Sequence, residues 1–218
     1  MIDLSEDELT ADRYFDLGSV QLAQGKWQEA INYFDKTIAL APKHFTAFVK
    51  RGTAKQELGI KTLGKPLTIG VDLSSSPLVK GAYEDFSKAV KLNPKCADAY
   101  KRRGLLQALS GNWALAISDY DLAIKANPKF SDAYDSRALV KKQNGDLTGA
   151  LADANKAIQN IDSAGAKSRW AFYRTRGDIK EKLGDIKGAV ADWKEAVRLF
   201  PDIGRELNPK IKSAQSGR

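Results

Sequence analysis

The stretch from Gly59 to Pro66 is the first place where residue types and spacing suggest chemistry. It reads Gly59, four residues, Gly64, Lys65 and Pro66, which is one residue away from the Gly-x4-Gly-Lys-Ser/Thr loop that binds nucleotide phosphates. That loop lies between a strand and a helix, and its last residue supplies a hydroxyl for magnesium. Pro66 replaces the hydroxyl and a helical pattern precedes the loop, so we expect no nucleotide site here.

The other candidates for catalysis are the single histidine, His44, and the single cysteine, Cys96. One histidine and one cysteine, without an orienting third group in reach, form neither a catalytic set nor a metal site. His44 follows the break at Pro42, as a linker residue would, and Cys96 occupies a turn, where a packing role is the simpler interpretation. We therefore expect no enzyme activity, no cofactor and no metal.

The composition is that of a globular protein. The chain has 218 residues, of which 43% are hydrophobic and 28% are charged. It contains no apolar run of the length that crosses a bilayer. Its first ten residues, MIDLSEDELT, are acidic and lack the basic and apolar regions of a secretory leader. These features predict a cytoplasmic protein, or a processed form that has lost a leader.

An internal repeat indicates the architecture. Four segments that begin with Gly and carry Ala five residues later align without a gap, at 25–42, 111–128, 145–162 and 184–201. A second signature, a segment that ends in Gly, precedes them at Gly18, Gly52, Gly104 and Gly177. The 34 residues from Pro94 to Pro128 correspond to one repeat. This pattern predicts pairs of antiparallel helices that stack, because each pair alone leaves an apolar face uncovered.

On these residues the chain resembles the tetratricopeptide repeat family. The resemblance implies an all-α fold, a right-handed α-solenoid of five helix-turn-helix repeats. The expected segments are an N-terminal extension at 1–10, repeats at 11–44, 45–96, 97–130, 131–169 and 170–203, and a C-terminal cap or tail at 204–218. We expect Gly59 to form the turn of the second repeat, as Gly25 does in the first. Pro209 is expected in the first turn of a C-terminal helix.

The second repeat is longer than the others. From Gly59 to Ala82 there are 23 residues instead of five, which predicts an 18-residue insertion, at about 60–80, between its two helices. Three interpretations are open: a loop that hides its alternating apolar side chains against the solenoid, an arm that binds a partner, or a disordered segment. As an arm it would bind through Lys61, Lys65, Leu67, Ile69, Val71 and Leu73.

The resemblance also implies a concave groove that is lined by the first helices and binds peptides. The residues expected to bind a partner there are Lys50, Thr53, Lys101, Arg102, Leu105, Leu139 and Arg174. One branch of the family grips the C-terminal carboxylate of chaperones with lysine, arginine and asparagine. Here Phe15, Ser19, Lys50 and Asp98 stand where that branch needs Lys, Asn, Asn and Lys, and only Arg102 fits. We therefore do not expect binding to chaperone tails.

Arginine recurs at the same position of four repeats, and the second helix of each of those repeats carries an aspartate. The first repeat has Leu17 and Tyr33 instead. Because the two charges are present together or absent together, we expect ion pairs between helices rather than a row of arginines for an acidic ligand. The predicted pairs are Arg51 with Asp85, Arg103 with Asp119, Arg137 with Asp153, and Arg176 with Asp192.

The net charge of +8 is unevenly distributed along the chain. Residues 1–44 hold 4 basic and 8 acidic side chains, whereas residues 45–96 hold 9 basic and 4 acidic ones. This polarity favours a partly acidic partner and permits self-association. Nucleic acid is less favoured, because basic and aromatic residues do not alternate as in stacking platforms.

The sequence thus predicts a non-catalytic adaptor or scaffold that binds a protein or peptide through the groove and the insertion. The alternative is a peripheral adaptor that links to an acidic polymer, such as a cytoskeletal filament, or to an anionic membrane surface. It would use the basic residues of the second repeat together with Lys210 and Lys212.

Overall fold

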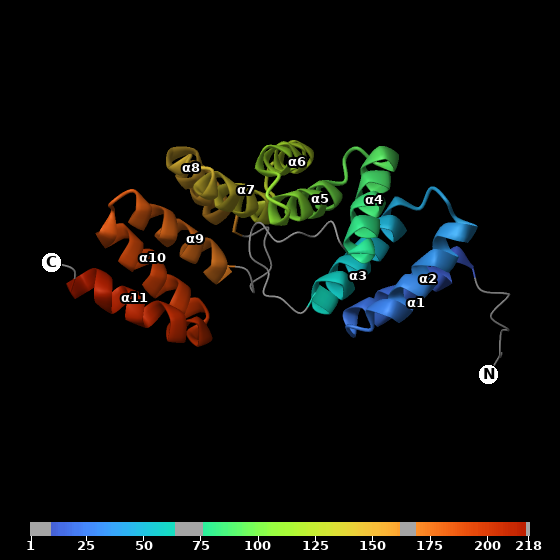
Figure 1. Ribbon diagram of the computed structural model, residues 1–218, viewed down its shortest axis with the longest axis horizontal. Helices are drawn as coiled ribbons and strands as arrows, with labels where there is room; N and C mark the ends of the chain where they lie inside the picture. Colours follow the sequence, from blue (N-terminus) through green and yellow to red (C-terminus); the bar gives the residue numbers. More distant parts are fainter. Residues whose placement is uncertain (1–9, 64–75, 162–168, 217–218) are drawn as a thin grey trace. The chain divides into compact units, whose positions relative to one another are not determined.

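The computed structural model describes residues 10–63, 76–161 and 169–216, and the regular elements in these ranges are all helical. In chain order they are α1 (Ala11–Ala23), α2 (Trp27–Leu40), α3 (Phe45–Leu63), α4 (Pro77–Leu92), α5 (Ala97–Leu109), α6 (Trp113–Ala126), α7 (Ser131–Gln143), α8 (Leu147–Gln159), α9 (Arg169–Lys182), α10 (Ile186–Leu199), the short 3-10 helix η4 (Pro201–Ile203) and α11 (Gly204–Ser216). The helices follow one another as hairpins (Figure 1). The predicted all-α fold of helix-turn-helix repeats is confirmed.

The chain divides into two compact units, residues 1–115 and 116–218. In the first unit, α1 packs on α2 and α3 packs on α4, while α2 also contacts α3 and α4 also contacts α5. In the second unit, α7 packs on α8 and α9 packs on α10, while α8 contacts α9 and α10 contacts α11. The second helices α2, α4 and α8 therefore each pack on their own first helix and on the next first helix, as a stack of repeats requires.

Glycine packs directly against an aromatic ring inside the repeats. A Cβ atom on Gly52 would lie 2.8 Å from the ring of Phe86, and one on Gly177 would lie 2.6 Å from the ring of Trp193. Both rings are fully buried. The first helix therefore has no side chain at this position because the ring of the second helix occupies that space.

The prediction that Gly59 forms the turn of the second repeat is wrong. Gly25, Gly111, Gly145 and Gly184 have positive φ angles, as helix-terminating glycines do, but Gly59 lies inside α3 and is buried. A Cβ atom there would lie 2.9 Å from the side chain of Val79, so this glycine permits α4 to approach.

The extra length of the second repeat extends both of its helices. Helix α3 has 19 residues where α1 and α5 have 13, and α4 begins at Pro77, with Ser76 as its N-cap. The rest of the expected insertion, residues 64–75, lies outside the described part of the chain.

Helix α11 covers the last hairpin of the second unit. Its side chains Leu207 and Ile211 are buried and pack on Ala189, Trp193 and Ala196 of α10. The prediction that Pro209 lies in the first turn of a helix is wrong, because α11 begins at Gly204 and Pro209 lies in its interior. The C-terminal segment is thus a helix that buries the outward face of α10.

Candidate functional site

A pocket in the first unit is formed by helices α1, α3 and α5. Helix α3 contacts both α1 and α5, so the first helices of successive repeats lie side by side. The pocket has a volume of about 270 Å³ and is lined by Leu22, Thr46, Val49, Lys50, Thr53, Cys96, Asp98 and Arg102. Of the predicted groove residues, Lys50, Thr53 and Arg102 thus share one site, which we call the groove pocket.

The floor of the groove pocket is apolar, with hydroxyl groups at two points. Val49 is 8% exposed, and Leu22 and Cys96 are half-buried. The Thr53 hydroxyl donates to the carbonyl oxygen of Val49 at 2.8 Å, and the Thr46 oxygen lies 2.9 Å from Nδ1 of His44. Each hydroxyl oxygen retains lone pairs, so the floor can contact an apolar side chain and accept a hydrogen bond from a ligand.

The rim of the groove pocket carries more positive than negative charge. Asp98 accepts a hydrogen bond of 2.8 Å from Arg102 and lies 3.6 Å from the Lys101 ammonium. The Lys50 ammonium lies 5.7 Å from the centre of the Phe15 ring. The lining of the pocket therefore holds two cations, Lys50 and Arg102, and one acid, Asp98, and this surface attracts a negatively charged group.

The two residues that suggested catalysis have packing roles. His44 accepts the Ala47 N–H at Nδ1 at 3.2 Å, which satisfies a donor in the first turn of α3, and its ring lies 4.7 Å from that of Phe15. Burial raises the pKa of the Cys96 thiol, so the thiol stays protonated at neutral pH and is a weak nucleophile. Gly59 lies inside a helix rather than after a strand, which does not suit a phosphate loop.

The other predicted groove residues lie elsewhere. Leu105 packs against the buried cluster that contains Phe86 and Leu109, so it contributes to the core of the first unit. Arg174 and Leu139 belong to the second unit, where Arg174 pairs with Glu206 of α11 and Leu139 is half-buried. The carboxylate of Glu206 thus already engages Arg174.

Only one of the predicted insertion contacts lies in the described part of the chain. The Lys61 ammonium, in the last turn of α3, lies 5.0 Å from the centre of the Trp27 ring. Lys65, Leu67, Ile69, Val71 and Leu73 lie outside the described residues. Their role in binding stays a prediction.

Sequence reasoning missed Leu22, Thr46 and Cys96 as pocket residues. Leu22 lies near the end of α1, Thr46 near the start of α3, and Cys96 is the N-cap of α5. Helical periodicity identifies residues near the middle of a helix face, but it does not show how neighbouring helix ends come together. The contact between Asp98 and Arg102 could be found from the sequence, because two residues four positions apart on a helix lie close enough to form an ion pair.

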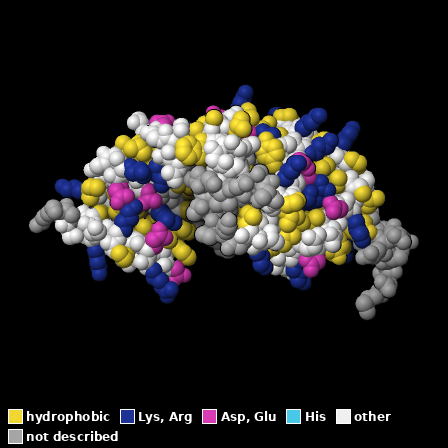
Figure 2. All heavy atoms as spheres, in the orientation of Figure 1, with side chains coloured by type: hydrophobic (Ala, Val, Ile, Leu, Met, Phe, Trp, Pro, Cys, Tyr) yellow, Lys and Arg dark blue, Asp and Glu magenta, His cyan; other side chains and the backbone are white. Residues whose placement is uncertain are grey.

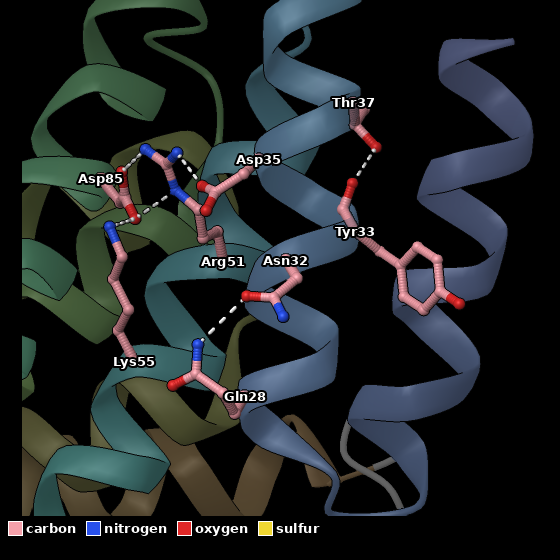
Figure 3. A network of polar contacts seen from close by, with 8 residues as sticks. All are labelled: Gln28, Asn32, Tyr33, Asp35, Thr37, Arg51, Lys55 and Asp85. Atoms are coloured by element: carbon pink, nitrogen blue, oxygen red, sulfur yellow. Dashed lines mark hydrogen bonds and ion pairs between the residues drawn. The ribbon is translucent and has the colours of Figure 1, made fainter. Parts of the chain in front are cut away.

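The arginines of three later repeats, Arg51, Arg137 and Arg176, each connect two second helices. Arg51 donates two hydrogen bonds to Asp85 of its own repeat, at 2.5 and 2.9 Å, and a third to Asp35 of the preceding repeat, at 2.6 Å (Figure 3). Lys55, one turn further along α3, lies 2.9 Å from the same Asp85. The contact with Asp35 lies between repeats, so Arg51 links neighbouring repeats as well as the helices of its own.

The second unit repeats this arrangement twice. Arg137 binds Asp153 and reaches back to Asp121, and Lys141 lies 2.9 Å from Asp153. Arg176 binds Asp192 at 2.7 and 2.8 Å and reaches back to Asn155, and Lys180 lies 2.8 Å from Asp192. The hydrogen bonds with Asp192 raise the pKa of Arg176. Arg103 and Asp119 belong to different units, so their pairing stays a prediction.

The described residues show no arrangement suited to a metal or a bilayer. Among them, no three His, Cys, Asp or Glu side chains lie close enough together to bind a metal ion. None of the described helices combines the length and the apolar composition that crossing a membrane requires.

Two family models, both described as tetratricopeptide repeat, match the chain at residues 11–44 and 80–132. Together with the helical repeats of the structure, these matches support a protein of the tetratricopeptide repeat family. No curated protein matches the sequence.

Solved structures of other repeat proteins share the fold. A thermophilic tetratricopeptide repeat protein from Thermus thermophilus is 18% identical, with a TM-score of 0.66 over 94% of this chain and 99% of that one. MamA from Desulfovibrio magneticus is 19% identical, with a TM-score of 0.64 over 88% and 96%. YrrB, described as a tetratricopeptide repeat protein with an unusual peptide-binding site, is 16% identical, with a TM-score of 0.61 over 92% and 91%.

Proposed function

We propose that this protein is a non-catalytic adaptor that binds a segment of a partner protein in the groove pocket of the first unit. The observation that carries this proposal is the composition of the pocket, which combines an apolar floor with two cations, Lys50 and Arg102, and one carboxylate, Asp98. Helices α1 and α3, which are the first helices of two repeats, and helix α5 with its N-cap supply these residues. The peptide-binding site named for YrrB gives further support.

The segment that fits best carries an acidic residue beside an apolar one. Its carboxylate would pair with Lys50, and its apolar side chain would contact Val49 and Leu22. Burial of one aliphatic side chain contributes about 1.5–3 kcal/mol, whereas a partly exposed ion pair contributes about 1 kcal/mol or less. Since binding also costs conformational and rigid-body entropy, we expect dissociation constants on the order of 10–100 µM.

The extended second repeat would add a second contact with the partner. Long connections in compact folds usually have a function, and Lys61 and Lys65 would place positive charge there. Leu63, at the end of α3, packs on the cluster around Val79 of α4, so a short turn between Leu63 and Ser76 could close the hairpin. Loop length changes closure entropy slowly, so this deletion should keep the fold and weaken partner binding.

Binding to an acidic polymer or an anionic membrane has less support. Arg51 and Lys55 of the second repeat are paired with Asp85, and Lys210 lies 2.9 Å from Asp178 and 2.7 Å from Glu181. Figure 2 shows acidic and basic side chains interspersed, rather than segregated, on the face drawn over α9 to α11. Paired charges contribute little to the binding of an anionic surface.

The test is selection from a phage-displayed random peptide library on the immobilised protein. We expect enrichment of peptides that carry an acidic residue next to an apolar one, and loss of that enrichment with the Lys50→Glu/Arg102→Glu variant. The matched control is Lys88→Glu/Lys91→Glu, which changes the net charge equally at two exposed sites of α4. Equal loss in both variants, or enrichment that disappears steeply with salt and has no common sequence, would indicate surface electrostatics instead.

A further inference from the structure

The negative charge at the start of the chain is concentrated in its first nine residues. Residues 10–44 hold four basic and four acidic side chains, so the whole acidic excess of residues 1–44 comes from residues 1–9. These nine residues, MIDLSEDEL, lie outside the described part of the chain and carry four acids and no base. A covalently attached acidic segment therefore precedes the unit that holds the positively charged groove pocket.

Three residues of this segment have the pattern that the groove pocket fits. Ile2, Asp3 and Leu4 place one carboxylate between two aliphatic side chains, and we call them the acidic triplet. The pocket combines the cations Lys50 and Arg102 with an apolar floor. The triplet thus offers a charge and an apolar surface that complement those of the pocket.

The acidic triplet is close enough in the sequence to reach the groove pocket. Thr10, the N-cap of α1, has an extended backbone with φ −73° and ψ 162° and does not continue the helix. An α-helix rises about 1.5 Å per residue, which places Leu22, the pocket residue of α1, about 18 Å along the axis from Thr10. Asp3 lies seven residues before Thr10, a length that spans up to about 23 Å when extended. Lys50 is nearer, because its ammonium lies 5.7 Å from the ring of Phe15, close to the start of α1.

We propose that the acidic triplet occupies the groove pocket of its own chain and competes there with the partner. This inference rests on the proposed function, because it assigns a resident ligand to the same pocket. Asp3 pairs with Lys50, and Leu4 packs on Val49 of the floor. The acidic segment is then an autoinhibitory contact that a partner must displace.

A tethered ligand acts at a high local concentration. A short flexible connection gives an effective concentration on the order of 1 mM. A single small contact of this kind has a dissociation constant on the order of 100 µM, the weak end of the range expected for the pocket. The ratio gives about ten occupied pockets for each open one. The apparent affinity of a competing partner is therefore about tenfold lower than its affinity for an open pocket.

The test is the rate at which iodoacetamide modifies Cys96 in the full chain, with no peptide added. Cys96 lines the groove pocket and is half-buried, so an occupant of the pocket restricts access to its thiol. We expect the Ile2→Ser/Asp3→Ser/Leu4→Ser variant to react up to about tenfold faster than the unaltered chain, with an unchanged helical circular dichroism spectrum. A synthetic peptide of residues 1–9, added to this variant, should slow the reaction again, with half of the effect at about 100 µM.

The matched control is Glu6→Ser/Asp7→Ser, which removes more charge from the same segment and leaves the acidic triplet in place. Its rate should stay within about twofold of the unaltered chain at physiological salt, where screening weakens distant charges. An equal acceleration in the control would overturn the proposal and indicate general electrostatics. An unchanged rate in the triplet variant would overturn it as well.

Two further measurements locate the occupant. In the Lys50→Glu/Arg102→Glu background the triplet substitutions should have no further effect, and an acceleration there would contradict binding in the groove pocket. The rate in the unaltered chain should be the same at about 1 and 100 µM protein, because a tethered ligand does not depend on concentration. A rate that falls with protein concentration would overturn the contact within one chain and make the segment of a second copy the occupant.

Failure of this contact can be told from failure of the proposed function. If library-selected peptides slow the modification of Cys96 but the triplet substitutions do not accelerate it, the pocket binds partners and this proposal alone is overturned. If the triplet substitutions accelerate it but no library peptide binds even the triplet variant, the resident contact is supported and the partner-binding function is contradicted.

Discussion

Replacing Arg137 with Met should destabilise the protein more than replacing Arg137 and Asp153 together. Arg137 donates hydrogen bonds of 2.6 and 2.8 Å to Asp153, whose side chain is only 6% exposed. A buried charge that loses its partner costs about 3–5 kcal/mol, whereas an exposed pair contributes about 1 kcal/mol or less. Because Lys141 remains 2.9 Å from Asp153, we expect an intermediate loss of about 2–3 kcal/mol in the free energy of unfolding.

The double variant, Arg137→Met with Asp153→Leu, removes the buried carboxylate as well as its partner. Lys141 is 21% exposed and Asp121 is 53% exposed, so both can turn to water when their partners are gone. We therefore expect the double variant to lose about 1 kcal/mol less than Arg137→Met alone. The two substitutions are coupled because each residue compensates the charge of the other.

The assay is urea unfolding followed by circular dichroism, with comparison of midpoints because repeat arrays do not always unfold in one step. Arg198→Met is the control, since Arg198 is 68% exposed and pairs with Glu195 at the surface, and its midpoint should not change. Additive losses in the double variant, or an Arg137→Met midpoint equal to that of the control, would refute the structural pair and favour a ligand-binding role for the arginines.

Three further predictions concern packing, protonation and capping. Gly52→Ala should lower the unfolding free energy by about 1–3 kcal/mol, because its Cβ would lie 2.8 Å from the Phe86 ring; an unchanged melting temperature would contradict this close packing. Burial raises the pKa of Asp135 to about 7, above the roughly 3.9 of an unfolded chain, so between these values the native state binds the extra proton and stability falls as pH rises. Asp135→Asn should therefore stabilise the protein by about 1–3 kcal/mol near pH 8 and hardly at all near pH 4, and an equal effect in urea titrations at both pH values would contradict the shift. Asp146→Ala removes the acceptor of the Gly149 N–H, at 2.8 Å, and should cost about 1 kcal/mol in thermal unfolding, whereas no loss would show that the cap is not formed in solution.

The sequence was sufficient to predict the helix hairpins, because their signals are local. Gly25 and Gly145 stand where the chain needs a positive φ angle, and the glycine that faces an aromatic ring recurs at a fixed spacing. Gly59 occupies the same register and has a different role, because the approach of α4 requires a small residue there. A glycine needed for backbone conformation cannot be told from one needed for close packing without the neighbouring helix.

Contacts between repeats were harder to predict. The helical spacing of Lys50 and Thr53 places them on one face of α3, and the structure places Arg102 of α5 in the same pocket. Cys96 joins them because of the angle at which successive repeats pack, which the sequence of one repeat does not encode. For the same reason, the contact from Arg51 back to Asp35 could not be found by comparing repeats individually.

Cys96 offers the most direct test of the proposed groove, because it is the single cysteine of the chain and lines the groove pocket. The measurement is the rate at which iodoacetamide modifies Cys96, followed by mass spectrometry, with and without a saturating peptide selected from the library. Binding in the groove pocket predicts that the peptide slows modification several-fold in the unaltered protein and has no effect in the Lys50→Glu/Arg102→Glu variant. A peptide that binds by calorimetry but leaves the rate unchanged would contradict the account and place the binding surface elsewhere.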